Sequence, residues 1–112
     1  MPAISARRLL SPEQQSTLKT VLEEHRQLRL DLIVEYSKQE LTDRAVAVAD
    51  REISDIIVLG AKSVLADINS ALARMRAGTY GRCVRCATVL PVDWLEELPQ
   101  LARCFDCERA TR

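Results

Sequence analysis

The four cysteines of this 112-residue chain form two pairs whose spacing is typical of a metal site. Two residues separate Cys83 from Cys86 and two separate Cys104 from Cys107, with 17 residues between the pairs. Two thiolates at this spacing turn a tight knuckle around one ion, and two knuckles complete a tetrahedral four-sulfur shell, most often around zinc. Because such a shell has no open coordination position, we expect one structural Zn²⁺ and no enzymatic activity.

Two other uses of paired cysteines fit the chain less well. Disulfides belong to an oxidising compartment, but the first ten residues carry Arg7 and Arg8 without the apolar stretch of a signal peptide. A redox dithiol needs a single Cys-x-x-Cys motif, usually after a strand, and the sequence has no strand pattern. We therefore expect a cytoplasmic zinc protein.

The composition favours a protein partner. With 16 basic and 16 acidic residues the formal net charge is zero, whereas binding through nucleic-acid phosphates needs a surplus of Lys and Arg. The longest apolar run, which begins at Ile56 and ends at Leu59, is much shorter than a membrane span, so we expect no membrane contact. The aromatic content of only 4% suits the aliphatic seam of a helical hairpin.

A first long helix is predicted from Ser11 onward. Ser11 is the expected N-cap, Pro12 takes the first helical position, and Gln14 completes a capping box. Apolar residues then recur at spacings of three and four, as in a heptad seam, at Leu18, Val21, His25, Leu28 and Leu32. His25 has no acidic or cysteine neighbour one turn away, so we expect it to pack and not to bind a metal.

The seam breaks in the polar stretch 37–43, and a second helix is predicted from Arg44 to Arg76. One apolar stripe runs along this helix, and Gly78 is suited to end it in a left-handed conformation; the stripe consists of Val46, Ile53, Ile57, Val64, Ile68, Leu72 and Met75. Ile56, Leu59 and Leu65 lie off the stripe, so we expect the lower half of this helix to pack against the cysteine module or the N-terminal segment as well. Exposed Ile56 and Leu59 could also pair two copies of the chain.

The expected fold is mainly α. A short connection between two long helices predicts an antiparallel coiled-coil hairpin over residues 11–77, with its tip at 38–45. Residues 1–10 form an N-terminal segment and residues 78–112 a four-cysteine zinc module. In that module Trp94 and Leu95 are placed to cover the metal site, and the module is so small that the ion must supply much of its stability.

The segment from Gly78 to Cys86, together with later residues of the module, resembles the DksA/TraR family of four-cysteine zinc-finger proteins; these later residues are Leu90, Pro91, Leu95, Pro99, Cys104 and Cys107. The segment Glu40-Leu41-Thr42-Asp43-Arg44-Ala45 is similar to the Asp-x-x-Asp-x-Ala motif at the family's coiled-coil tip, with Glu in place of the first Asp. The two motifs together cover most of residues 40–107.

The resemblance implies a bacterial transcription regulator that binds RNA polymerase directly and does not bind DNA. In this family the zinc end lies at the rim of the polymerase secondary channel, and the coiled coil passes through it towards the active centre. Asp43 and Ala45 are then expected to alter open-complex stability, with support from Glu40 and Arg44. Arg82 and Arg85 are the next candidates for contact, at the channel rim.

One departure from the family concerns the nucleotide ppGpp. Family members that respond to ppGpp use basic residues at three positions, which in this chain are Leu98, Glu108 and Asp67. Carboxylates repel an anionic ligand, so we expect no ppGpp binding through these residues.

Other functions remain open. From the residues alone, Asp43 is better explained as a helix N-cap, and only the family resemblance favours a role at the tip. The chain as a whole is alternatively a zinc-stapled helical adaptor or a nucleic-acid-binding zinc ribbon. Glu40 and Asp43 also form a possible metal-binding pair like the tip carboxylates of the Gre transcript-cleavage factors.

Overall fold

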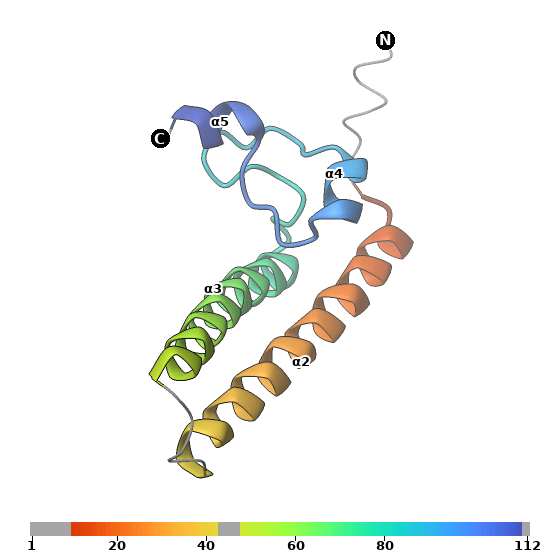
Figure 1. Cartoon of the computed structure of the whole chain (residues 1–112). Helices are drawn as coiled ribbons and strands as arrows, with labels where there is room; N and C mark the ends of the chain where they lie inside the picture. Colours follow the sequence, from red (N-terminus) through yellow and green to blue (C-terminus); the bar gives the residue numbers. More distant parts are fainter. Residues whose placement is uncertain (1–9, 43–47, 111–112) are drawn as a thin grey trace.

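The computed structural model describes residues 10–42 and 48–110 of the chain. These residues form four helices and no strand: α2 (Pro12–Thr42), α3 (Val48–Ala77), α4 (Val92–Glu97) and α5 (Phe105–Ala110). The molecule measures 63 × 32 × 22 Å, and α2 and α3 lie side by side along its length (Figure 1). The segment that carries the cysteines lies at one end of this helix pair (Figure 1).

The start of α2 confirms the predicted capping box. The Ser11 hydroxyl accepts a hydrogen bond from the Gln14 backbone N–H at 3.0 Å, and the Gln14 side-chain oxygen accepts one from the Ser11 N–H at 2.9 Å. Two of the N–H groups that a helix start leaves without partners are thereby satisfied. Pro12 is the first residue of the helix, as its sequence position indicates.

The helix α2 continues to Thr42, beyond the point at which the apolar pattern breaks. Lys38, Gln39, Glu40 and Leu41 all have high helix propensity, so the loss of a buried stripe does not end the helix. The expected tip at 38–45 therefore begins as helix. The rest of this tip, residues 43–45, and the predicted start of the second helix at Arg44 lie outside the described residues.

The core lies where the two long helices meet the cysteine module. Leu22 on α2 and Ile68 on α3 are completely buried, and Leu18, Ala71, Leu72 and Met75 join them in one cluster. Arg26 Nε donates a hydrogen bond to Asn69 Oδ1 at 2.9 Å on the surface beside this core.

The predicted heptad seam on α2 is wrong at its far end. Leu28 is 56% exposed and Leu32 is 36% exposed. One row of buried and partly buried positions runs along α2 at a mean spacing close to 3.6 residues, with Val21 and Leu30 partly buried beside it; the row consists of Leu18, Leu22, His25, Arg29, Ile33 and Tyr36. That is the period of a straight helix, and a 3.5-residue repeat drifts away from it by about 20° per heptad.

The predicted stripe on α3 is correct from Ile57 onward and wrong at Ile53, while Val46 lies outside the described residues. Ile53 is 56% exposed, whereas Ser54 and Ala61 are buried. The expectation that the lower half of the helix contacts the module is confirmed by Ile68, which shares a cluster with module residues. Ile56 and Leu59, which lie off the stripe, are 69% and 70% exposed.

The C-terminus of α3 forms as its glycine predicts. Gly78 adopts a positive φ of 78°, which costs glycine nothing because it has no Cβ. The N–H groups of Thr79 and Tyr80 then both reach the Arg74 carbonyl, at 2.9 and 3.2 Å. The chain turns sharply at this point and enters the first cysteine pair.

The module packs onto the helix pair through a few apolar side chains. Leu90 and Leu95 are buried in the same cluster as Leu22 and Ile68. The Tyr80 hydroxyl donates a hydrogen bond to the Pro99 carbonyl at 2.8 Å, which joins the start of the module to the segment between its two cysteine pairs. This packing fixes the module on the helix pair and brings the two cysteine pairs together.

One helix stretch has the composition of a membrane span. Arg51–Ala77 is long enough to cross a bilayer, and the mean hydropathy of its most apolar 18-residue window is 1.5. Core helices of many proteins outside membranes meet the same criterion of length and composition, so this observation by itself carries no assignment.

Candidate metal centre

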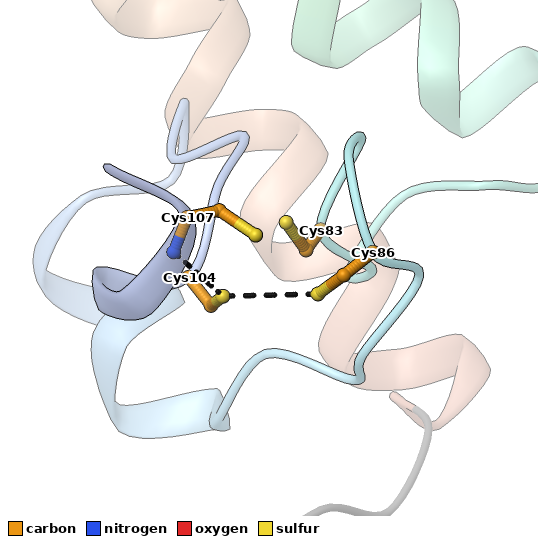
Figure 2. A group of neighbouring side chains, drawn as sticks. All are labelled: Cys83, Cys86, Cys104 and Cys107. Carbon is orange, nitrogen blue, oxygen red and sulfur yellow. Dashed lines mark hydrogen bonds between the residues drawn. The ribbon is translucent and has the colours of Figure 1, made fainter. Parts of the chain in front are cut away.

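The four cysteine sulfur atoms converge at one point, between the two knuckles (Figure 2). All four lie within 4.8 Å of one another, and Cys86 Sγ is 3.8 Å from Cys104 Sγ. All four are free thiols. The predicted ligands Cys83, Cys86, Cys104 and Cys107 therefore form one cluster that is able to hold a metal ion.

The spacing of the sulfurs fits tetrahedral coordination. A metal–sulfur bond of about 2.3 Å places neighbouring sulfurs of a tetrahedron about 3.8 Å apart. The Cys86–Cys104 separation equals this edge. A disulfide, in contrast, holds its sulfurs about 2.0 Å apart. The cluster is thus arranged for a shared ion.

Backbone hydrogen bonds shape the first knuckle. The Cys83 N–H bonds to the Thr88 carbonyl at 2.8 Å, and the Ala87 N–H bonds back to the Cys83 carbonyl at 2.9 Å. Ala87 has a φ of 63°, a conformation that costs a residue with a Cβ about 1 kcal/mol or more. The turn is therefore held in a strained form that keeps Cys83 and Cys86 on the same side.

The second knuckle leads into α5, a helix that the sequence analysis missed. The Cys107 N–H points at Cys104 Sγ at 3.5 Å, and the Glu108 N–H bonds to the Cys104 carbonyl at 2.9 Å. Asp106 and Glu108 lie in the first turn of α5 and Arg109 in its last turn, which suits the helix dipole. This charge order was the available sequence signal.

The surroundings of the sulfurs change their acidity in different directions. Burial of Cys83 opposes its ionisation, but backbone N–H groups of Cys104, Cys86 and Arg85 outweigh it and lower the Cys83 pKa to about 6. The Thr88 side chain lowers the pKa of Cys86. Hydrogen bonding to Cys104, together with burial and the other sulfurs, raises the Cys107 pKa to about 12. Crowded sulfurs cannot all ionise without a cation, which is the state that a bound metal supplies.

An open groove of about 500 Å³ borders the cluster on the side of Cys86, Cys104 and Cys107. Trp94 and Phe105 line it, with ring centroids 4.1 Å apart and an interplanar angle of 33°. Trp94 thus lies beside the metal site, as predicted. Leu95 is fully buried in the core behind it.

The three positions compared above with the ppGpp site lie in one cleft. Asp67, Leu98 and Glu108 line an open space of about 520 Å³ between α3 and the module. Arg74 and Arg103 line it too, and Arg103 Nη1 is 3.9 Å from a Glu108 carboxylate oxygen. Both carboxylates therefore face the space that an anion would enter, and the absence of ppGpp binding stays a prediction.

The remaining predicted residues lie on the first knuckle or belong to the tip. Arg82 and Arg85 are exposed on the first knuckle, and Arg82 Nη1 donates to the Ala87 carbonyl at 3.2 Å. Asp43, Arg44 and Ala45 lie outside the described residues, and of Glu40 only the backbone, within α2, is described.

Comparisons of the chain with protein-family models, curated proteins and solved structures gave no match.

Proposed function

We propose that this protein is a zinc-containing transcription regulator of the DksA/TraR type, which binds RNA polymerase directly and inserts its hairpin tip through the secondary channel. The proposal rests on the sequence resemblance described above. The observation in its favour is the distance between the metal centre and the far ends of α2 and α3, at opposite ends of one rod (Figure 1).

Zinc is the ion that the centre suits best. A shell of four thiolates favours soft metals, and a tetrahedral arrangement of single sulfurs is typical of zinc or of an iron site. The four free cysteines would fill all four coordination positions of a tetrahedral ion, so the ion would stabilise the module and bind no substrate. Cys83, Cys86, Cys104 and Cys107 would hold it.

The proposed hairpin is antiparallel. Leu18 and Leu22, near the start of α2, share a cluster with Met75 and Leu72, near the end of α3, and Arg26 bonds to Asn69 farther along the pair. At 1.5 Å per residue each helix spans about 45 Å. Residues 43–47 connect the two helix ends that lie farthest from the cysteines.

Such a rod suits a protein that acts inside a narrow channel. The pair of helices is slender, whereas a globular domain of the same mass would be too wide to enter such a channel. A carboxylate at the tip, such as that of Asp43, would interact with basic side chains or a bound Mg²⁺ at the channel's inner end. The zinc module would remain outside, where Arg82 and Arg85 are exposed.

Binding to core RNA polymerase is the first test. Purified protein should be retained by immobilised core polymerase, and a factor known to occupy the secondary channel should displace it. Retention that such a factor does not reduce would contradict the channel site, and no retention at all would favour the adaptor alternative.

The Asp43→Asn variant tests the tip. It should abolish the effect of the protein on open-complex lifetime while polymerase binding, zinc content and helicity stay unchanged. Asp55→Asn is the matched control, because Asp55 is an exposed carboxylate in the described part of α3. Shortened transcripts from stalled complexes would instead indicate Gre-like cleavage.

A further inference from the structure

Exposed aliphatic side chains lie along the helix pair, from the middle of α2 to the first turns of α3. Leu28 and Leu32 on α2 and Ile53 and Ile56 on α3 are between 36% and 69% exposed. The apolar stretch Arg51–Ala77 is only 22% buried over its most apolar window. An apolar surface of this kind is a common mark of an interaction site.

The Arg26–Asn69 hydrogen bond shows which faces of α2 and α3 lie on the same side of the helix pair, because two bonded side chains must lie on one side. At about 100° per residue, Leu28 lies about 160° around α2 from Arg26, and Ile56 lies about 140° around α3 from Asn69. Ile53 is farther still from Asn69, about 160° around the helix. These side chains therefore share the side opposite to Arg26 and Asn69, which we call the apolar face: Leu28, Leu32, Ile53 and Ile56.

Gly60 lies in the middle of this face. It is about 180° around α3 from Asn69, and a Cβ at Gly60 would meet no atom within 4 Å. The backbone of α3 is thus open to close approach by a partner at this point.

Acidic side chains border the apolar face. Each of the following exposed residues lies within about 60° of Leu28 or Ile56 around its helix: Glu24, Asp31, Glu35, Glu52 and Asp67.

Basic side chains follow the other side. Each of the following exposed residues lies within about 20° of Arg26 or Asn69 around its helix: Lys19, Arg51, Lys62 and Arg76. Glu23 and Asp55 also lie on this side, about 60° from Arg26 and about 40° from Asn69, and Glu23 pairs with Lys19 at 3.4 Å. Arg74 lies on the side of Ile56 around α3, but it is partly buried and donates to the Leu101 carbonyl at 3.4 Å. Exposed acidic side chains thus predominate on the side of the apolar face, and exposed basic side chains predominate on the other side.

The acidic border decides which partner fits. A second copy of the chain on this face would bring acidic borders together, and like charges across an interface suppress pairing. Anionic lipid surfaces attract Lys and Arg and repel carboxylates. A protein surface with aliphatic side chains surrounded by Lys and Arg is complementary in both respects.

We propose that the apolar face is the side of the hairpin that lies against RNA polymerase, and that the polymerase surface it meets presents aliphatic side chains flanked by Lys and Arg. This inference rests on the proposed function. It adds which side of the rod is the contact side and which chemistry recognises it.

The test compares polymerase binding by variants of the 112-residue protein loaded with zinc. Ile53→Gln/Ile56→Gln should weaken binding to core RNA polymerase at least tenfold. Val34→Gln should change it less than twofold, because Val34 is 53% exposed but lies nearer to Arg26 around α2. Unchanged helicity and zinc content in each variant show that folding is intact.

A charge-reversal pair adds an electrostatic readout. Glu35→Lys/Glu52→Lys should weaken binding and reduce its dependence on salt, whereas Lys19→Glu/Lys62→Glu should do neither. Both double variants change the net charge equally in magnitude.

The possible failures are distinct. If wild-type protein binds polymerase and both glutamine variants bind equally well, this inference is wrong and the proposed function stands. If wild-type protein does not bind, both fail. A wild-type dimer that Ile53→Gln/Ile56→Gln converts to monomer in sedimentation would show that a second copy covers the face. Flotation with phosphatidylserine vesicles that the same variant abolishes would assign the face to a membrane, and either result overturns the inference.

Discussion

Cys86 Sγ lies 3.8 Å from Cys104 Sγ although 18 positions separate the two residues in the chain. Near them, the Val84 N–H bonds to the Ala102 carbonyl at 2.8 Å, so the knuckles also meet through the backbone. A shared ion would close the loop between them and stabilise the module beyond what its small core provides.

Removal of one sulfur should therefore release the ion. In Cys104→Ser we expect the zinc content to fall from one equivalent to near zero, since a hydroxyl is a poor zinc ligand. Much of the helicity should remain, because Leu22 and Ile68 pack between α2 and α3 without the ion. Elemental analysis and circular dichroism measure both, and a variant that retains one equivalent of zinc would contradict the four-sulfur site.

The Thr88 hydroxyl should tune the metal affinity. It lies 3.1 Å from Cys86 Sγ, and loss of a hydrogen bond to a ligand typically weakens metal binding about 10- to 100-fold. We expect Thr88→Val to bind one zinc ion with affinity reduced in this range, as measured by competition with a chromophoric chelator. Thr79→Val, at an exposed position, is the matched control.

The sequence predicted the parts of the structure that depend on local chemistry. The Ser11–Gln14 capping box and the glycine at the end of α3 follow from which backbone groups each residue can satisfy. The convergence of the cysteines follows from the Cys-x-x-Cys spacing. The first two features need no knowledge of distant contacts, and the meeting of the two cysteine pairs is predicted from the four ligands that one shared ion needs.

The features that the sequence analysis missed depend on how the helices pack. Apolar periodicity does not distinguish a 3.5-residue from a 3.6-residue repeat over a few turns, so it places Leu28 and Leu32 in the seam although both are exposed. Their exposure, and that of Ile53, follows from the direction in which the partner helix lies. The cleft that joins Asp67 to Glu108 likewise exists only after the module docks on α3.

Two leucines on α2 distinguish the predicted heptad seam from the row of positions that is buried in the structure. Leu22 is completely buried and Leu28 is 56% exposed. Truncation of a buried leucine costs about 2–5 kcal/mol, whereas an exposed one costs about 0.5 kcal/mol or less. We expect urea unfolding of the zinc-bound protein to show this difference between Leu22→Ala and Leu28→Ala. Equal losses would support the predicted heptad seam instead.

Two glycines should respond in opposite ways to alanine. Gly60 lies inside α3, where an added Cβ would have no neighbour within 4 Å, so Gly60→Ala should stabilise the protein by about 0.5–1 kcal/mol. Gly78 has equal space but a φ of 78°, so Gly78→Ala should destabilise it by about 1 kcal/mol. Thermal unfolding of both variants measures the two signs, and stabilisation by both would show that Gly78 does not need its left-handed conformation.

Tyr80 should make stability fall at high pH. Burial raises the pKa of Tyr80 to about 12, against a weaker opposite effect of Arg74. Because the unfolded chain loses this proton near its ordinary pKa of about 10, the contribution of Tyr80 is complete below that pH and is lost as the pH rises towards 12. The expected slope in this window is at most about 1.4 kcal/mol per pH unit.

Tyr80→Phe isolates this contribution, because the other groups that titrate in the same range are common to both proteins. Near neutral pH the variant should be less stable by about 1 kcal/mol, since the buried Pro99 carbonyl loses its hydrogen bond from the Tyr80 hydroxyl. Between pH 10 and 12 the difference in free energy of unfolding should shrink and then change sign. Only the wild-type protein must keep the Tyr80 hydroxyl protonated in the folded state while the unfolded chain loses this proton to the solvent. Urea unfolding of both proteins at closely spaced pH values measures the difference. A difference that stays constant through this window would mean that the Tyr80 hydroxyl titrates alike in the folded and unfolded chains, and so is not shielded from water by the module.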